Sequence, residues 1–342
     1  MSLLSGINDF FGLDIGTSAV RVVQLSGANL SRYGSVPIDP RIAASDSLPD
    51  QQKIADIVKN LIAQSKVSSK NVAVGIPSSK VFATVVDIDR LPAHELEKTV
   101  QYQVENYIPM QLSEAKYDWA LLGDSPKEKS KVEILISSVG SKYVEQRLDM
   151  LESIGLNVIA FEPDSLAITR ALTPANTMTA QLLLDIGNDA TDLVITLFGM
   201  PRLVRSIPTG SSALVRAAVQ NLSIDDTQAK QFVFKFGLAE DKLEGQVYKA
   251  IISTIDGLIS EVDKSIKFFT TRYTGVNIEK IIVSGSASVL PNFPIYLANK
   301  TGLNVEIGNA WRNVSIPSSR QNDLMAVANH FAVAAGLAER VV

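Results

Sequence analysis

The segment FGLDIGTSAVRVV, at residues 11–23, consists of an apolar run, an Asp-Ile-Gly turn and a run rich in valine. A second segment, LLLDIGNDATDLV at residues 182–194, repeats this order. The aspartates of the two turns, Asp14 and Asp185, are 171 residues apart (185 − 14), which is half the length of the 342-residue chain. Such a repeat predicts two lobes built on one plan. Each copy predicts a strand, a tight turn and a second strand, and not the strand-to-helix turn of a Rossmann unit.

The rest of the chain alternates between strand and helix patterns. Apolar and β-branched runs predict seven further strands, at residues 72–76, 81–87, 117–122, 132–139, 158–162, 202–207 and 280–284. Apolar residues spaced three or four positions apart predict seven helices, at residues 52–65, 93–107, 142–154, 211–221, 227–236, 253–273 and 323–338. Alternating strands and helices are typical of a layered α/β fold.

The order of these elements also predicts a domain division. Residues 79–162 read strand, helix, strand, strand, helix, strand, which predicts a small α+β subdomain inserted into the first lobe. The remaining parts are predicted as a first-lobe core at residues 1–78 with 163–178 and a C-terminal helix at 323–342, a second-lobe core at residues 179–210 and 249–322, and a small helical subdomain at residues 211–248.

The composition excludes several classes of protein. Hydrophobic residues make up 46% of the chain and charged residues 20%, as in ordinary globular proteins. The net charge of -4 offers no basic field for a nucleic-acid backbone, so we expect no nucleic-acid partner. There is no cysteine and there are only two histidines, His94 and His330, which argues against thiol chemistry and multi-histidine metal sites. Residues 1–11 do not read as a secretory signal and no apolar run is long enough to span a membrane, so we expect a cytoplasmic protein.

The duplicated turns suggest a chemistry. A glycine at a tight turn lets the backbone approach a phosphate closely, and successive amide N–H groups form a pocket for an anion. Two such turns on opposing lobes predict a site for one nucleoside triphosphate, with Asp14 and Asp185 holding Mg²⁺ through water. A single turn of this kind is ordinarily only a hairpin. It is the matched second copy that favours the phosphate interpretation.

A third segment, IIVSGSASVLP at residues 281–291, predicts a buried strand that ends in small residues. Small residues there leave room for a base and a ribose to lie against the backbone. The sequence contains neither the phosphate loop Gly-x-x-x-x-Gly-Lys-[Ser/Thr] nor the fingerprint Gly-x-Gly-x-x-Gly. A nucleotide is therefore expected to bind by a different design.

Together, the three segments resemble the first phosphate, second phosphate and adenosine motifs of the actin-like ATPase superfamily. Within it the chain is most similar to the type IV pilus assembly protein PilM family, relatives of the cell-division protein FtsA. The resemblance also rests on residues 12–21, where lysine is usual at the place of Arg21, on residues 105–109 with 117–119, and on residues 331–338.

The resemblance implies an actin-like ATPase fold with two lobes, a duplicated RNase H-like core and an inserted subdomain of the family's 1C type at residues 79–162. It implies ATP and Mg²⁺ as cofactors, with Asp14 and Asp185 as metal ligands through water and Asp185 positioning the metal and a water for catalysis. The residues expected to contact the nucleotide are Asp14, Gly16, Thr17, Ser18, Arg21, Asp185, Gly187, Asn188, Thr191, Lys230, Gly285, Ser286 and Ala287.

The implied function is that of a cytoplasmic adaptor at the inner face of the cytoplasmic membrane. Such a protein binds the N-terminal tail of a PilN-like membrane protein in a groove formed largely by the 1A and 1C subdomains, and it links that tail to the pilus motor ATPases. Self-association and the rate of hydrolysis are left open, and we expect a slow ATPase at most.

Two departures from the family pattern affect the nucleoside end of the site. The family usually has Ala-Glu-x-x-Lys where this chain has Ala229, Lys230 and Val233, so the glutamate that contacts the ribose is replaced by a lysine. Ser286 stands where a second glycine is common. These changes favour weak base preference and keep a pseudo-ATPase scaffold as an alternative.

Aromatic and apolar residues gather between residues 102 and 119, although aromatic residues are only 6% of the chain. Side chains of this kind are enriched at protein interfaces. We therefore predict that Tyr102, Tyr107, Ile108 and Met110 bind the partner peptide. The alternative is that they form the core of the small subdomain.

Other members of the superfamily were weighed. A sugar or acid kinase needs a substrate lobe and a carboxylate placed on the acceptor hydroxyl, and the chain shows no additional domain for this. An FtsA-like, filament-forming division protein stays as an alternative. FtsA-like proteins end in a basic amphipathic membrane helix, which residues 339–342 do not resemble.

Overall fold

The computed structural model describes residues 9–174 and 176–341, and residues 1–8, 175 and 342 lie outside the described part. Two predictions concern residues that lie partly outside the described part: the absence of a secretory signal at the start of the chain, and the two ends of the first-lobe core.

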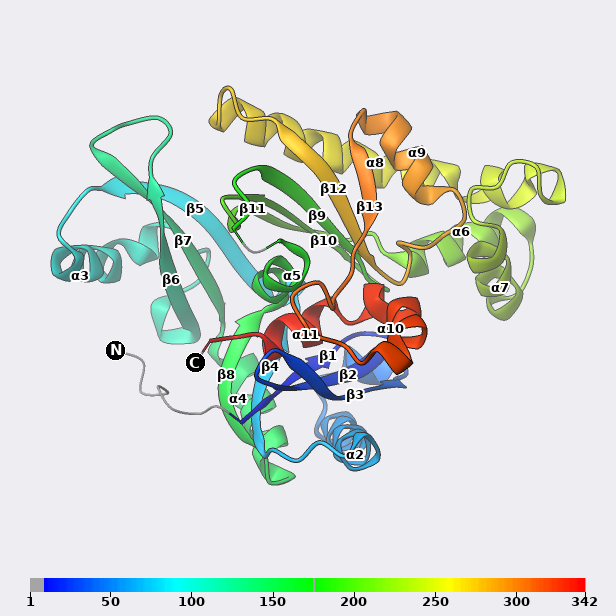
Figure 1. Ribbon diagram of the computed structural model, residues 1–342, viewed down its shortest axis with the longest axis horizontal. Coiled ribbons are helices and arrows are strands. Elements are labelled where there is room, and N and C mark those ends of the chain that lie inside the picture. Colours follow the sequence, from blue (N-terminus) through cyan, green and yellow to red (C-terminus); the bar gives the residue numbers. More distant parts are fainter. Residues whose placement is uncertain (1–8, 175, 342) are drawn as a thin grey trace.

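Two five-stranded sheets dominate the fold, and a three-stranded sheet stands beside them (Figure 1). Strands of the first sheet, in spatial order, are β3 (Asn29–Pro37), β2 (Ala19–Ser26), β1 (Phe11–Ile15), β4 (Asn71–Ile76) and β8 (Asn157–Pro163). Strands of the second are β11 (Met200–Ile207), β10 (Thr191–Leu197), β9 (Ala180–Ile186), β12 (Ile278–Gly285) and β13 (Asn304–Ile307).

The two sheets share one strand order, which confirms the predicted duplication. In each, the first three strands in sequence form an antiparallel meander, and the last two run parallel to the first. The predicted hairpins are present in matching register, with Asp14 opposite Arg21 and Asp185 opposite Asp192. The repeat seen in sequence is therefore a repeat in three dimensions.

Helices cover the outer face of each sheet and fill the space between the sheets. The outer face of the first sheet packs against α2 (Leu48–Ser65) and α4 (Ser141–Ser153). The outer face of the second packs against α6 (Ser211–Leu222), α7 (Asp226–Phe236), α8 (Gln246–Arg272) and α9 (Phe293–Thr301). Between the sheets lie α5 (Asp164–Leu172), α10 (Gln321–Val327) and α11 (Ala332–Ala338), in one core with the inner faces of both sheets.

The backbone of the central helix α11 lies in close contact with the backbones of β1 and α5. A Cβ atom added to Gly336 would lie 1.9 Å from the carbonyl oxygen of Ala167 in α5, and one added to Gly12 in β1 would lie 2.3 Å from the carbonyl oxygen of Ala334. The glycine and alanine content of residues 331–338 makes this approach possible. The close contact sets the spacing of the first sheet, α11 and α5.

The three-stranded sheet, in the order β5 (Val81–Asp89), β7 (Lys131–Gly140), β6 (Ala115–Asp124), packs with α3 (Ala93–Gln103) around its own apolar core. We call residues 81–140 the inserted block. The predicted insertion ran to residue 162, but β8 pairs with β4 in the first sheet, and Met150 and Leu151 of α4 are buried in the first-lobe core. The parallel pairing places α4 and β8 in the first lobe. The remaining domain boundaries stay predictions.

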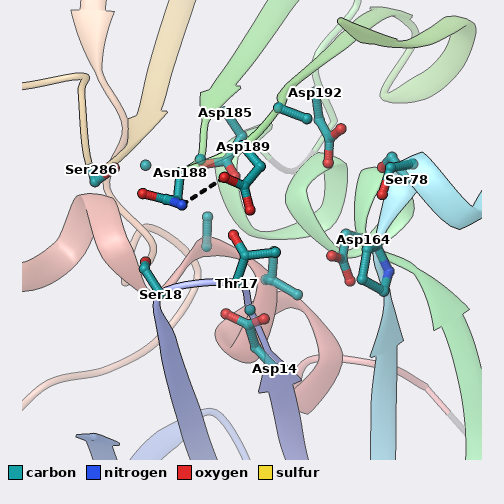
Figure 2. Close-up of a pocket in the computed structure, with 18 of the residues that line it drawn as sticks. Asp14, Thr17, Ser18, Ser78, Asp164, Asp185, Asn188, Asp189, Asp192 and Ser286 are labelled. Carbon is teal, nitrogen blue, oxygen red and sulfur yellow. Dashed lines mark hydrogen bonds between the residues drawn. The ribbon is translucent and has the colours of Figure 1, made fainter. Parts of the chain in front are cut away.

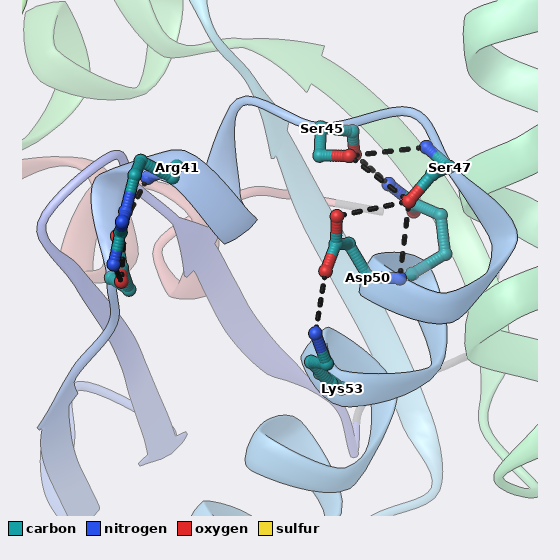
Figure 3. Close-up of polar contacts among 7 residues, drawn as sticks. Arg41, Ser45, Ser47, Asp50 and Lys53 are labelled. Atoms are coloured by element: carbon teal, nitrogen blue, oxygen red, sulfur yellow. Dashed lines mark hydrogen bonds and ion pairs between the residues drawn. The ribbon is translucent and has the colours of Figure 1, made fainter.

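The start of α2 differs from the expected one because of a local cap. Helix α2 begins at Leu48, where Ser47 accepts the Asp50 backbone N–H at 3.4 Å and Asp50 pairs with Lys53 at 2.8 Å (Figure 3). A short helix, α1 (Pro40–Ala43), precedes it and is capped by Asp39. Both caps satisfy N–H groups that the first helical turn leaves unpaired.

The single helix predicted at residues 323–338 is wrong. It is two helices, α10 and α11, separated by a 3₁₀ turn at Ala328–His330. In that turn the Asn329 side chain donates hydrogen bonds to the Gly285 carbonyl at 3.1 Å and to Ser288 Oγ at 3.0 Å. Anchoring this buried amide to the end of β12 interrupts a pattern that is otherwise helical.

Candidate functional site

A cavity of about 130 Å³ lies between the two lobes and is lined by both Asp-Ile-Gly turns (Figure 2). Strand alternation explains why the aspartates reach it. In β1, Leu13 and Ile15 pack in the outer core of the first lobe, so Asp14 between them points to the inner face; Leu184 likewise directs Asp185 inward from β9. The carboxylates of the two repeats thus approach one space from opposite lobes.

The two turns have the same backbone hydrogen bond. Gly16 N–H donates to the Ala19 carbonyl at 3.1 Å, and Gly187 N–H donates to the Ala190 carbonyl at 3.0 Å. Within residues 9–174 and 176–341, no protein acceptor takes the backbone N–H of Thr17, Ser18, Asn188 or Asp189, all of which line the cavity. Unpaired backbone N–H groups, here two from each lobe, are the donors from which anion-binding pockets are built.

Ten of the residues expected to contact nucleotide line this cavity. They are Asp14, Gly16, Thr17, Ser18, Arg21, Asp185, Gly187, Asn188, Gly285 and Ser286. Gly285 has a φ of +82°, and a Cβ there would lie 2.4 Å from the Ile186 carbonyl oxygen, so the turn after β12 requires glycine. Ser286 lies at one end of the cavity in Figure 2.

Three expected residues do not line it. Thr191 is buried, and its hydroxyl donates to the Thr209 carbonyl at 2.6 Å. Ala287 is buried in the second-lobe core, and Lys230 is exposed on α7. Thr191 and Ala287 thus support the turns from behind.

Six polar residues that the motifs did not indicate also line the cavity, and three of them, Ser78, Asp164 and Asp192, form a group. Ser78 follows β4 and Asp164 follows β8, while Asp192 lies in β10 opposite Asp185. In Figure 2 these three lie together at the end of the cavity away from Ser286. The parallel pairing of β1, β4 and β8 brings their carboxyl ends to one edge. The sequence signal was present, since Asp164 follows a predicted strand, but it required knowing which strands are neighbours.

The electrostatics of the cavity are those of crowded carboxylates. Burial raises the pKa of Asp185 to about 6, and repulsion from Asp14 adds to this rise. Burial raises the pKa of Asp192 to about 7, and repulsion from Asp185 adds to it. Burial also raises the pKa of Asp14, although Arg21 at 3.1 Å opposes the rise, and burial with four neighbouring carboxylates raises the pKa of Asp164 well above its usual range. A bound divalent cation would relieve this repulsion.

The donor set fits Mg²⁺ held through water. Mg²⁺ prefers oxygen ligands and keeps much of its hydration. In the described part of the chain, no group of three or more His, Asp or Glu side chains is arranged to bind a metal ion directly. Asp164 Oδ1 is buried and has no hydrogen-bond partner among the described residues, so it is a candidate acceptor for a metal-bound or attacking water.

A second cavity, of about 230 Å³, lies between the inserted block and the first lobe. We call it the groove. Its block wall comes from β5, β6 and β7, and its first-lobe wall from β4, β8, α4, α5 and Arg340. Its lining residues are Ile76, Val81, Lys116, Tyr117, Asp118, Ser137, Ser138, Val139, Val144, Phe161, Glu162, Pro163, Leu166 and Arg340. The lining is mixed, with apolar side chains beside two serines and four charged residues.

The four residues predicted to bind the partner lie elsewhere in the block. Ile108 is buried in the block core, and Tyr107 and Met110 pack against that core. Tyr102 on α3 is 83% exposed. Ile108 therefore fits the alternative of a core residue, and the assignment of the four to a partner remains a prediction.

Comparison with known proteins decides the family. Residues 12–342 match the model of the type IV pilus assembly protein PilM family. The chain belongs to the PilM family. A solved structure described as the PilM-PilN type IV pilus biogenesis complex is similar to this PilM family member at 25% identity and a TM-score of 0.82, over 96% of this chain and 97% of the other.

More distant likenesses define the fold. The ethanolamine utilization protein EutJ from Carboxydothermus hydrogenoformans is 14% identical with a TM-score of 0.60, over 96% of this chain and 88% of the other. MreB5 of Spiroplasma citri, solved bound to AMPPNP, is 13% identical with a TM-score of 0.53, over 96% and 95%. The chain has the actin-like ATPase fold, as the resemblance implied.

One further expectation concerns membranes. Among the residues that the structure describes, no helix is both long enough and apolar enough to cross a bilayer.

Proposed function

We propose that this PilM family member is an ATP-binding adaptor of the type IV pilus assembly machinery. The observation that supports it most is the meeting of both Asp-Ile-Gly turns in one cavity, in a chain similar along 96% of its length to the protein of a PilM-PilN complex. The proposal has two parts, a nucleotide site between the lobes and a peptide site in the groove.

In the nucleotide site, the free N–H groups of Thr17, Ser18, Asn188 and Asp189 hold the phosphates. The nucleoside lies toward Ser286, and the terminal phosphate lies toward Asp164 and Asp192, which occupy the opposite end in Figure 2. Mg²⁺, when bound, supplies positive charge against the phosphates. Asp14 and Asp185 hold its water ligands by accepting hydrogen bonds.

The pairings of these aspartates prepare them for that role. Arg21 holds Asp14 in place, and the Ser284 hydroxyl donates to Asp185 Oδ1 at 2.6 Å. Each contact leaves other carboxylate lone pairs available. Asp164 is the candidate for orienting a water toward the terminal phosphate, and its buried setting is consistent with slow turnover or none.

In the groove, a bound peptide would be recognised mainly by the backbone N–H and C=O groups on the unpaired side of β6. β6 is an edge strand of the three-stranded sheet, so one side of its backbone has no strand partner among the described residues. An extended peptide binds such an edge by adding a strand, while pockets beside it select side chains. Tyr117, Phe161 and Leu166 supply apolar contact, and Lys116 supplies positive charge, while Arg340 is paired with Glu162 at 2.6 Å. The occupant that we propose is the N-terminal segment of a PilN-like inner-membrane protein.

This role places the protein in the cytoplasm at the inner face of the cytoplasmic membrane, with the pilus motor ATPases as further partners. An FtsA-like filament protein and a pseudo-ATPase scaffold of a related secretion system remain alternatives. The departures at Lys230 and Ser286 favour the scaffold over a fast ATPase.

The peptide site can be tested by fluorescence anisotropy. A labelled peptide copying the N-terminus of the PilN-like partner is titrated against wild type and against Leu166→Ala and Tyr117→Ala, whose folding is checked by thermal melting. We expect the Kd to rise at least tenfold in each. Tyr102→Ala changes an exposed aromatic residue outside the groove and tests the earlier prediction that Tyr102 binds the partner; the groove proposal expects it to keep the wild-type Kd. Wild-type affinity in both groove variants with loss in Tyr102→Ala would transfer the site to the α3 surface.

A further inference from the structure

A buried polar network joins the inserted block to the second lobe. Glu133 in β7 is 1% exposed, and its Oε1 accepts hydrogen bonds from Arg272 Nη2 at 2.6 Å, Arg272 Nε at 3.0 Å and the Tyr273 hydroxyl at 2.8 Å. Arg272 Nη2 also donates to Asp87 Oδ2 in β5 at 3.0 Å. In Figure 1 the end of α8 that carries Arg272 lies on the side of the second sheet toward the block.

A second arginine of the same lobe completes the network. Arg202 in β11 is 6% exposed; its Nη2 donates to the Leu122 carbonyl of β6 at 2.8 Å, and its Nε lies 3.6 Å from Glu133 Oε2. The two arginines come from the second lobe, and the two carboxylates, Asp87 and Glu133, come from the block. Each of the three strands of the block is therefore hydrogen-bonded to the second lobe, although the block is inserted in the sequence of the first lobe.

Buried charges of this kind define an orientation. A pair that is matched and hydrogen-bonded offsets the cost of leaving water, whereas the same charges mismatched by a small rotation do not. The Glu133–Arg272 hydrogen bonds therefore favour the docked orientation, while Glu133 Oε2, Asp87 Oδ1 and Arg202 Nε and Nη1 have no hydrogen-bond partner among the described residues. When the contact opens, the charges regain their hydration, so the net cost of opening is smaller than the individual hydrogen bonds suggest.

The groove lies at the other end of the same strands, against the first lobe: Val81 and Val139 line it, whereas Asp87 and Glu133 are at the latch end. Its block wall is thus attached to the second lobe while its opposite wall, with Phe161 and Leu166, belongs to the first. Any rotation of one lobe against the other changes the distance between these walls.

Two short segments, residues 76–81 and 163–164, contribute residues to the lining of both cavities. Ile76 and Val81 line the groove, while Ser78 and Ser79 between them line the nucleotide cavity. At the end of β8, Pro163 lines the groove and the next residue, Asp164, lines the nucleotide cavity. A shift at the cavity is thus transmitted within a few residues to the groove.

We propose that Glu133, Arg272 and Arg202 form a latch that makes the inserted block move with the second lobe, so that closure of the interlobe cavity reshapes the groove. The statement about the groove rests on the proposed function; the statement about the latch does not. Loss of the latch removes these buried polar contacts between the block and the second lobe and leaves the weaker contacts between β5 and β11.

The latch is tested by pulsed electron spin resonance on the full chain. Because the chain has no cysteine, introduced cysteines are the only sites for spin labels. Labels at exposed Lys98 on α3 and Asn299 on α9 report the distance between block and second lobe. We expect a narrow distribution in wild type and one broadened at least twofold in Arg272→Ala. A milder variant, Asp87→Asn, keeps the test available if Arg272→Ala does not fold, and we expect it to broaden the distribution in the same direction.

The matched control is Arg205→Ala. Arg205 lies in β11 like Arg202, but its partners, Glu261 at 2.9 Å and Ser265 at 2.7 Å, are within the second lobe. This variant should keep the wild-type distribution. A distribution as narrow in Arg272→Ala and Asp87→Asn as in wild type would overturn the latch.

The consequence for the groove is tested by peptide affinity with and without Mg-ATP. Coupled sites typically change each other's affinity by about 5- to 150-fold. We expect at least a fivefold change in wild type that falls toward none in the latch variants, with Mg-ATP affinity itself retained. No effect of Mg-ATP on wild-type peptide affinity would overturn the coupling. Failure of wild type to bind peptide at all would instead remove the proposed function, and the distance measurement would still decide the latch.

Discussion

The clearest consequence of the crowded cavity is an unusual pH dependence of stability, which Asp192→Asn should remove. The pKa of Asp192 is raised from 3.8 to about 7, first by burial and then by Asp185. A carboxyl with a raised pKa in the folded state keeps its proton longer there than in the unfolded chain. The stability that it contributes is therefore full below pH 4 and is lost as the pH rises to 7.

The magnitude follows from the two pKa values. A rise from 3.8 to about 7 is equivalent to about 4 kcal/mol of lost stability above pH 7, and about 3 kcal/mol of that is lost between pH 5 and pH 8. Asparagine has nearly the same shape and no charge, so the variant avoids this loss. It should also lower the pKa of Asp185, because the repulsion between the two carboxylates disappears.

The assay is urea unfolding at pH 5, 6, 7 and 8 in a chelator, with wild type and variant side by side. We expect the free energy of unfolding of Asp192→Asn to rise relative to that of wild type as the pH rises, by up to about 3 kcal/mol from pH 5 to pH 8. Glu97→Gln, which removes an exposed carboxylate on α3, should follow wild type throughout. Parallel pH profiles of wild type and Asp192→Asn would refute the crowding argument. Added Mg²⁺ should stabilise wild type at pH 8 more than the variant.

Three further outcomes follow. Asp185→Ala should abolish the divalent-dependent part of ATP binding and Asp14→Ala should weaken it, as measured by calorimetry; wild-type affinity in both would remove the metal assignment. ATP and GTP should differ in Kd by less than tenfold in a competition assay, since Lys230 and Ser286 depart from the family's nucleoside contacts, and a strong ATP preference would contradict this. Gly336→Ala should destabilise the protein by about 1–3 kcal/mol or more in urea unfolding, because the new methyl group meets the backbone of Ala167. Gly257→Ala, in α8 with open space around its Cβ position, should instead stabilise by about 0.5–1 kcal/mol, and equal effects of the two would contradict the packing argument.

Local patterns were sufficient to predict much of this protein. The apolar runs around each Asp-Ile-Gly turn in residues 11–23 and 182–194 predicted the two hairpins, and their shared order predicted the duplicated lobes. The prediction that both turns line one cavity followed from the same residues, because a turn places its own N–H groups and glycines without help from distant parts of the chain.

Only the tertiary structure decided which distant residues meet. The order of parallel strands brought Ser78 and Asp164 to the same sheet edge as Asp14, and it assigned β8 to the first lobe and not to the inserted block. The contact of Asn329 with the end of β12 broke a helix that periodicity predicts as continuous. The Glu133 latch joins residues more than a hundred positions apart, and no local pattern records such a pairing. Sequence periodicity reports the face on which a side chain lies, whereas the neighbour that covers this face depends on the packing of the whole chain.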